Sequence, residues 1–160
     1  MEPIRVAWGS GRGPTATASF DAALADANLA NYNLVTVSSV VPADATVERV
    51  DTAPDLGPTG DGLHCVLARA TREPDTGAPA VAGLGWARTP SGSGLFYEES
   101  GSDPDAIRAE VTAGLDHGLA IRDWTPEQDP EVVVEKRPGS ADSYTTAVVV
   151  AAYGRSESLL

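Results

Sequence analysis

Residues 144–153 read Tyr-Thr-Thr-Ala-Val-Val-Val-Ala-Ala-Tyr. The centre of this stretch, residues 147–152, contains only valine and alanine. An apolar run of this length, rich in β-branched residues, is typical of a strand that is covered on both of its faces. The stretch therefore predicts an interior strand in a layered protein.

Further strands are predicted before this one, because short runs of apolar and β-branched residues alternate with polar residues and end at Gly or Pro. The predicted strands cover residues 4–8, 33–41, 63–70, 81–88, 95–98 and 131–136. Clusters of Gly, Pro and polar residues predict loops at residues 9–14, 43–62 and 72–79, the last of them the loop of a β-hairpin.

Two helices are predicted. The first covers residues 19–28, with Ser19 as its N-cap and apolar residues at helical spacing. The second begins after Ser102-Asp103-Pro104-Asp105, where a capping residue, a proline and an acid meet, and its apolar residues repeat every four positions. Because the strands cluster between the helices and do not alternate with them, the sequence predicts one α+β layered sandwich domain over residues 1–160.

The composition narrows the class of protein. The chain has 160 residues and a formal net charge of −12, and Lys136 is its only lysine. Acidic residues are spread along the chain, which argues against nucleic acid or an anionic membrane as a partner and indicates a surface adapted to high salt. Because the N-terminus lacks a signal-peptide pattern and no apolar run could span a bilayer, we expect a cytoplasmic protein.

The sequence argues against a reactive cysteine, a metal site and a dinucleotide-binding site. The single cysteine, Cys65, lies in an apolar stretch and is predicted to be a buried structural thiol. Neither His64 nor His117 has neighbours at metal-ligand spacing, so we expect no metal. The glycines of residues 9–13 do not match a dinucleotide-binding fingerprint, and a tight turn is predicted there.

The segment Asn33-Leu-Val-Thr-Val-Ser38-Ser39-Val-Val-Pro42 is unusual, because two serines are adjacent within an otherwise apolar predicted strand. A buried strand avoids consecutive hydroxyls unless each hydroxyl finds a hydrogen-bond partner. Taken alone, the pair is interpreted as half-buried and bonded to the backbone.

Taken with three other stretches, this segment resembles the pyruvoyl-dependent arginine decarboxylases. That family has an Asn, a short apolar strand and then Ser-Ser-Ile/Val-x-Pro. The other stretches follow the family's order along the chain, and they are Phe20-Asp-Ala-Ala-Leu24, Gly94-Leu-Phe-Tyr-Glu98 and Gly118-Leu-Ala-Ile-Arg122-Asp-Trp124. The resemblance covers nearly the whole chain and implies a layered αββα sandwich of the pyruvoyl-dependent histidine/arginine decarboxylase type.

The resemblance implies an enzyme that cuts itself between Ser38 and Ser39, giving chains 1–38 and 39–160. Ser39 would become a covalent pyruvoyl group, and Asn33 would assist this self-cleavage. The enzyme would then decarboxylate L-arginine to agmatine and CO₂ through a Schiff base on that group.

The resemblance also assigns roles around the substrate. Glu98 matches the family's proton donor, and the adjacent Glu99 stays an alternative. Asp21 matches a substrate-binding position, and the new carboxylate of Ser38 is a second candidate for binding the guanidinium. The family's sites lie between protomers, which implies a homotrimer of cleaved protomers or a dimer of trimers. Two alternatives stay open: a pyruvoyl decarboxylase of another amino acid, and an uncleaved oligomeric binding protein.

Overall fold

The computed structural model describes residues 1–75 and 77–160. The described part of the chain forms nine strands and two helices. In chain order they are β1 (Ile4–Gly13), α1 (Ala16–Asp26), β2 (Asn33–Thr36), β3 (Val40–Val41), β4 (Val47–Asp51), β5 (Gly62–Arg72), β6 (Ala80–Arg88), β7 (Gly94–Gly101), α2 (Pro104–Ala120), β8 (Glu131–Arg137) and β9 (Tyr144–Tyr153). The predicted loop at residues 72–79 joins β5 to β6, and Thr76 within it lies outside the described residues. The predicted hairpin is wrong, because β5 and β6 belong to different sheets.

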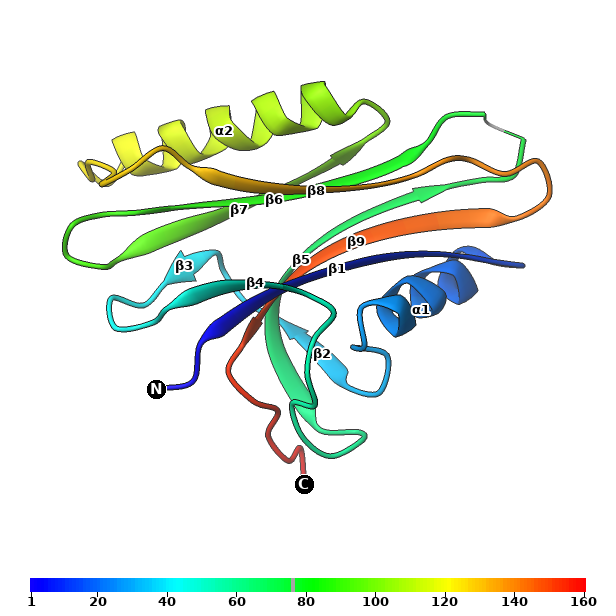
Figure 1. Cartoon of the computed structure of the whole chain (residues 1–160), viewed down its shortest axis with the longest axis horizontal. Coiled ribbons are helices and arrows are strands. Elements are labelled where there is room, and N and C mark those ends of the chain that lie inside the picture. The colour runs from blue at the N-terminus through cyan, green and yellow to red at the C-terminus, as the bar shows by residue number, and fades with distance from the viewer. Residues whose placement is uncertain (76) are drawn as a thin grey trace.

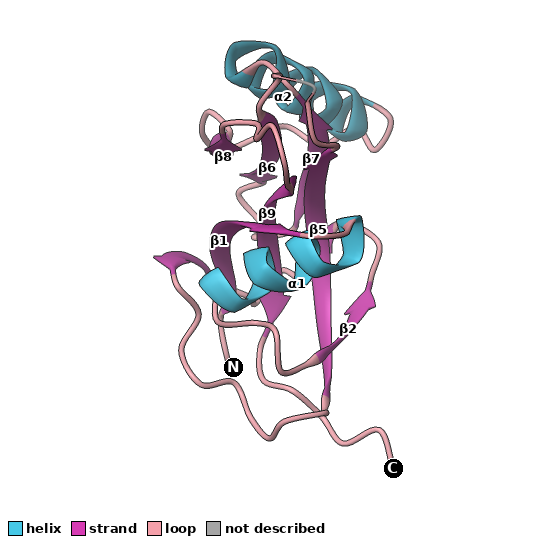
Figure 2. Cartoon of the chain, turned by 90° about the vertical axis from the view of Figure 1, so that its right-hand side faces the viewer, coloured by secondary structure: helices cyan, strands magenta, loops and turns pink. Residues whose placement is uncertain are grey.

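The strands form two sheets that pack face to face. One sheet has the order β2-β5-β9-β1-β4, and the other has the order β3-β7-β6-β8. Helix α1 covers the outer face of the first sheet and α2 covers the outer face of the second, as Figures 1 and 2 show. The α+β class and the αββα layering predicted from the sequence are therefore confirmed.

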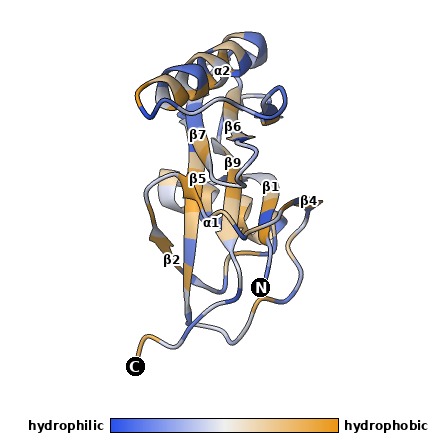
Figure 3. Ribbon diagram, turned by 90° about the vertical axis from the view of Figure 1, so that its left-hand side faces the viewer, coloured by the Kyte–Doolittle hydropathy of each residue, from blue (hydrophilic) through white to orange (hydrophobic). Residues whose placement is uncertain are grey.

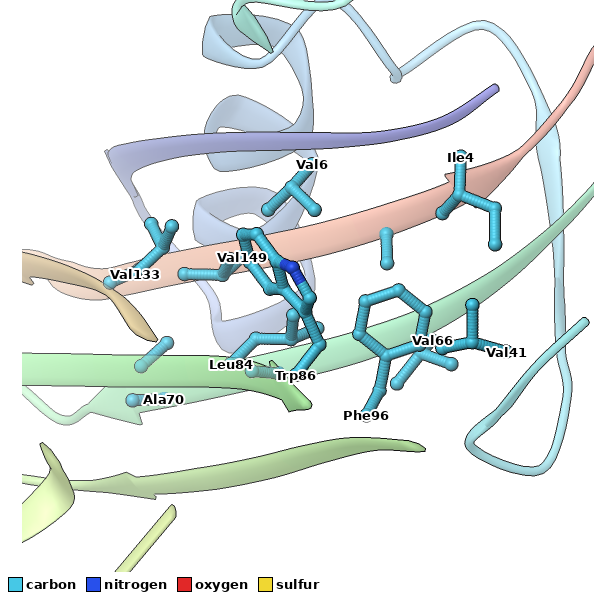
Figure 4. Close-up of a cluster of buried hydrophobic side chains, with 14 of the residues drawn as sticks. Ile4, Val6, Val41, Val66, Ala70, Leu84, Trp86, Phe96, Val133 and Val149 are labelled. Atoms are coloured by element: carbon cyan, nitrogen blue, oxygen red, sulfur yellow. The ribbon is translucent and has the colours of Figure 1, made fainter. Parts of the chain in front are cut away.

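Three apolar clusters fill the spaces between these layers. The cluster between the two sheets contains Trp86, Phe96 and Val149 together with smaller residues of both sheets (Figure 4). Separate clusters lie between α1 and the first sheet and between α2 and the second sheet. In Figure 3, α2 alternates between hydrophilic and hydrophobic colour, as expected for a helix that buries one face.

The predicted turn at residues 9–14 is wrong, because β1 continues through it to Gly13 and pairs with β9 along its whole length. Its alternate glycines face α1. A Cβ at Gly9 would lie 2.6 Å from the carbonyl oxygen of Ala23, and one at Gly11 would lie 2.6 Å from the Cβ of Ala22. The glycines therefore serve close packing of the helix on the strand.

Helix α1 begins three residues before the prediction. Its N-cap is Thr15, whose hydroxyl accepts a hydrogen bond from the backbone of Ala18. Ser19, the predicted cap, is fully buried within the helix, and its hydroxyl lies 2.7 Å from that of Thr146. By contrast, α2 begins at the predicted Asp103-Pro104 pair, and the side chain of Asp103 caps it.

Two strand predictions also need correction. The predicted loop at residues 43–62 contains β4, an exposed edge strand that pairs in parallel with β1. Its sequence, Val-Glu-Arg-Val-Asp, is too polar to be recognised as a strand. The predicted strand at residues 33–41 is two strands, β2 and β3, which belong to different sheets. Among the described residues, neither helix combines the length and apolar content that a membrane span requires.

Candidate active site

Residues 33–41, here named the crossover segment, run from one sheet to the other. At its start β2 pairs in parallel with β5, and at its end β3 pairs antiparallel with β7. Both β2 and β3 are edge strands of their sheets. The bond between Ser38 and Ser39 therefore lies where the chain crosses between the two sheets.

Backbone hydrogen bonds hold the crossover segment on both sides of this bond. The N–H of Val37 donates to the carbonyl of Cys65 in β5, at 2.9 Å. The N–H of Phe96 in β7 donates to the carbonyl of Ser39, at 2.7 Å. Each side of the Ser38–Ser39 bond is thus attached to a different sheet.

A tight turn surrounds Ser39. The N–H of Val40 donates to the carbonyl of Ser38, at 2.9 Å, which is the hydrogen bond of a γ-turn. The hydroxyl of Tyr153, at the end of β9, donates to the carbonyl of Val40, at 2.8 Å. Nothing in the sequence marked Tyr153 as a neighbour of the serines, because this contact joins positions that are 113 residues apart.

The carboxylate of Glu98 contacts the side chain of Ser39. The Ser39 hydroxyl donates to Glu98 Oε2 over a long distance of 3.4 Å. Along β7, Phe96 packs between the two sheets whereas Leu95 and Tyr97 pack against α2. Because side chains alternate along a strand, Glu98 shares the face of Phe96 and Glu99 shares the opposite face. This geometry favours Glu98 over Glu99 as the group that acts next to residue 39.

The environment of Glu98 favours its protonated form. Its side chain is still exposed in the single chain, but burial of part of the carboxyl raises the pKa of Glu98 above the usual range for glutamate. The hydrogen bond from Ser39 acts in the opposite direction, and the negative charge of Glu99 adds to the increase in pKa. A raised pKa is what a carboxyl needs in order to give a proton near neutral pH.

An open pocket of about 590 Å³ lies beside this edge of the sandwich. Helix α1, the loop after it and strands β2, β5 and β7 contribute to its wall. The lining residues are Phe20, Leu24, Tyr32, Asn33, Leu34, Thr36, Leu67, Ala68, Arg69, Glu98, Glu99 and Ser100. Three of the sequence-predicted residues, Asn33, Glu98 and the alternative Glu99, thus lie on one cavity, and Ser39 contacts Glu98.

Asn33 fixes the start of β2. Its side-chain amide donates to the carbonyl of Gly60 at 2.7 Å, and its backbone N–H donates to the carbonyl of Asp61 at 2.9 Å. These bonds belong to a residue that opens a strand. The expected role of Asn33 in self-cleavage stays a prediction.

Asp21 stands apart from this group. It lies on the exposed side of α1 and is not one of the described residues that line the pocket. Its neighbour Phe20 does line it, and the guanidinium of Arg69 lies over the Phe20 ring, 4.4 Å from the ring centre. Arg69 was not singled out by the sequence, because a lone arginine in a predicted strand carries no pattern.

The residues that could bind metal are dispersed. Across residues 1–75 and 77–160, His, Cys, Asp and Glu nowhere form a group of three that could hold a metal ion. Cys65 is buried, and this burial raises the pKa of its thiol to about 11. The prediction of a buried structural thiol is confirmed, since a thiol with this pKa is inert at neutral pH.

Comparison with known proteins agrees with this arrangement. The sequence model of the family described as pyruvoyl-dependent arginine decarboxylase matches residues 3–158. A protein of that name from Halobacterium salinarum is 51% identical over 160 residues, which cover 98% of this chain and 97% of the relative.

More distant relatives carry the same name. The protein from Thermococcus sibiricus is 33% identical over 90% of this chain and 91% of its own. The one from Methanothermobacter thermautotrophicus is 29% identical over 94% of this chain and 95% of its own. The Halobacterium relative also agrees with the adaptation to high salt that the charge predicts. From the match over residues 3–158 and the site geometry together, we conclude that this chain belongs to the pyruvoyl-dependent arginine decarboxylase family.

Proposed function

We propose that this protein decarboxylates L-arginine to agmatine and CO₂ with a pyruvoyl group made from its own Ser39. The observation that carries the proposal is the contact between Ser39 Oγ and Glu98 Oε2, at 3.4 Å, beside a pocket of about 590 Å³. The family to which the chain belongs supplies the pyruvoyl chemistry and the substrate.

The pyruvoyl group would arise by self-cleavage. Ser39 Oγ attacks the carbonyl carbon of Ser38, the C–N bond breaks, and the hydroxyl proton ends on the nitrogen of Ser39. The resulting ester joins Ser38 to Ser39 Oγ. Loss of the Cα proton of Ser39 and rupture of its Cβ–Oγ bond then release chain 1–38 as a carboxylate. Water converts the dehydroalanine left at position 39 into the ketone and ammonia, which gives chain 39–160.

The surroundings of residue 39 fit such a group. Its carbonyl is held by the N–H of Phe96, and its side chain points toward Glu98 at the pocket. A pyruvoyl group at this position would supply a ketone for the substrate amine and an acceptor for the electron pair left by CO₂. Glu98, with its raised pKa, is placed to hold the proton that returns to the α-carbon.

Substrate binding and assembly are proposed together. Asp21 and the new carboxylate of Ser38 are suited to bind a guanidinium, but Asp21 does not line the pocket of its own chain among the described residues. We therefore propose that protomers assemble as a homotrimer or a dimer of trimers, in which α1 of one protomer can reach the site of another. Val35 and Val40 on the two edge strands are 37% and 44% exposed, which supports a partner at this edge. A cytoplasmic location stays a prediction from the sequence.

Two measurements test this function. Intact-mass analysis of the protein, folded in high salt, should find two chains, with a break at Ser38–Ser39 and a pyruvoyl mass at the start of the larger one. A CO₂-release assay across the amino acids should then give the highest kcat/KM with L-arginine. A single unbroken chain of 16.5 kDa would favour an uncleaved binding protein. Self-cleavage into two chains, together with a preference for a different amino acid, would support the pyruvoyl chemistry and replace arginine as the proposed substrate.

A further inference from the structure

We propose that the backbone N–H of Val40 is the oxyanion donor of the self-cleavage reaction, and that Tyr153 is a positioning residue that holds Val40 in place. This inference rests on the proposed self-cleavage at Ser38–Ser39. It assigns a role to a backbone group within the serine motif and another to a tyrosine outside the motifs.

The carbonyl of Ser38 is the group under attack, and Val40 already donates to it. When Ser39 Oγ adds to this carbonyl, its oxygen becomes negatively charged. The N–H of Val40 lies 2.9 Å from that oxygen before the reaction begins. A donor that is aimed at the developing charge in advance needs no reorganisation during the reaction, which is the condition for effective oxyanion stabilisation.

The direction of the Val40 N–H is fixed by its own peptide unit. The Ser39 carbonyl and the Val40 N–H belong to one planar group, so the orientation of the first sets the orientation of the second. Phe96 N–H donates to the Ser39 carbonyl at 2.7 Å. Strand β7 therefore aligns the donor on one side.

Tyr153 holds the next peptide unit from the opposite sheet. Its hydroxyl donates to the Val40 carbonyl at 2.8 Å, and its ring lies against Phe96 with 6.1 Å between ring centres. Partial burial raises the pKa of Tyr153 to about 12, with smaller contributions from Cys65 and Glu98, so its hydroxyl stays protonated and able to donate. Val40 is thus held between β7 and β9, and the γ-turn around Ser39 cannot relax without breaking one of these bonds.

The side chain of Asn33 does not occupy this position. Its amide nitrogen donates to the carbonyl of Gly60, at 2.7 Å. In the uncleaved chain, the donor to the Ser38 carbonyl is therefore a backbone group, not a side chain.

The first test compares Tyr153→Phe with Tyr144→Phe. Tyr144 begins β9 and Tyr153 ends it, so the two variants lose the same hydroxyl from opposite ends of one strand. Unfolded full-length chains are diluted into high salt, and the cleaved fraction is followed by intact mass. We expect Tyr153→Phe to cleave about tenfold more slowly than the wild type, and Tyr144→Phe to cleave at the wild-type rate. Equal rates for all three would overturn the role of Tyr153, provided that thermal melts show all three folded.

Hydroxylamine identifies the step that slows. It cleaves an ester between Ser38 and Ser39 Oγ but leaves the peptide bond intact. If Tyr153 acts on the attack, added hydroxylamine will not restore scission in Tyr153→Phe, because the ester has not formed. Restored scission would place the delay at the later elimination and contradict the proposal.

The second test removes the Val40 N–H itself. Cys65, the single cysteine, allows a synthetic peptide 1–64 to be ligated to a recombinant chain 65–160, so that the Val40 amide can be replaced by an ester. We expect self-cleavage at Ser38–Ser39 to slow about 100-fold. The matched control is an ester at Val37, whose N–H donates to Cys65 over the same 2.9 Å without contacting the Ser38 carbonyl.

The outcomes separate this inference from the proposed function. If the ligated wild-type chain never breaks at Ser38–Ser39, the proposed function fails. If it does break, and the Val40 ester breaks as quickly as the Val37 ester, the function stands and the oxyanion role is lost.

Discussion

Strand β9 and the crossover segment have similar sequences but very different structures. Both are apolar runs rich in valine, and each is predicted from the sequence as one continuous strand. Strand β9 has the predicted bounds, lies between β1 and β5, and is buried along most of its length. The crossover segment pairs over four residues with β5 and two residues with β7, and its centre belongs to neither ladder.

The difference shows where this fold allows a backbone reaction. A peptide unit within β9 has both of its groups committed to neighbouring strands, and changing its geometry would disrupt a sheet. Among the residues that the structure describes, only Val40 donates a hydrogen bond to the Ser38 carbonyl, within the same turn, while the residues around it are attached to different sheets. The residues on either side therefore hold the Ser38–Ser39 bond in place. The Ser38 carbonyl is nevertheless open to attack by the Ser39 hydroxyl.

Ser39→Ala should have the largest effect, because it should abolish the reaction at the crossover segment and leave strand β9 unchanged. Without Oγ there is no nucleophile, so we expect one intact chain and complete loss of decarboxylation. The fold should be kept, since residue 39 contributes backbone bonds that alanine also makes. Intact mass, thermal melting and CO₂ release check this together. An active variant would refute the assignment of the pyruvoyl group to Ser39.

Glu98→Gln should give the next largest effect. Removal of a general acid lowers kcat by a factor of about 10² to 10⁴, and Glu99→Gln, on the opposite face of β7, should have far less effect. Because burial raises the pKa of Glu98, the wild-type kcat should be highest at low pH, where Glu98 is protonated, and fall as pH rises through this raised pKa. Glu98→Gln should lack this decline. If Glu99→Gln were the more damaging change, the proton donor would have to be reassigned.

Val149→Ala should have the opposite outcome to the substitutions above. It should lower the stability of the fold and leave the chemistry unchanged. Val149 is fully buried between the sheets (Figure 4). Its truncation should lower the free energy of unfolding by about 2 kcal/mol, and self-cleavage should still go to completion. The free energy of unfolding is measured with denaturant on proteins that also carry Ser39→Ala, because these stay as one intact chain. The control is Leu159→Ala near the C-terminus, which is 58% exposed and should cost less than about 0.5 kcal/mol.

Asp21→Ala should have the smallest effect. If Asp21 binds the guanidinium, its loss should raise KM for arginine about tenfold, the value of one charge-assisted hydrogen bond, with kcat little changed. Asp26→Ala, on the same helix, is the control, because Asp26 instead accepts a bond from the backbone of Ser10. An unchanged KM would remove Asp21 from the substrate site.

The sequence predicted the layers better than the details of the edges. Alternation and apolar runs identify β5 to β9 because these strands are buried, and burial controls which residues they contain. The glycines of β1 were misread because the sequence does not show whether a glycine serves a turn or close packing on a helix. Strand β4 was missed because an edge strand exposes most of its side chains and so tolerates polar residues.

For the site, the motifs indicated which residues matter but not which of them meet. Strand alternation separates Glu98 from Glu99, but only the pairing of β3 with β7 brings Ser39 to Glu98. Tyr153 is a strand-end tyrosine in the sequence and a neighbour of Val40 in the fold. Contacts between distant positions depend on sheet order, which a single sequence does not encode in any local pattern.

The position of β1 has a consequence for how the mature protein loses its structure. Chain 1–38 would carry β1, which lies in the interior of its sheet between β9 and β4. Once the link to residue 39 is broken, unfolding would release two separate polypeptides, so the melting temperature of the mature protein should rise with its concentration. An uncleaved chain would unfold to a single polypeptide. Its melting temperature would depend on concentration only through its contacts with other subunits.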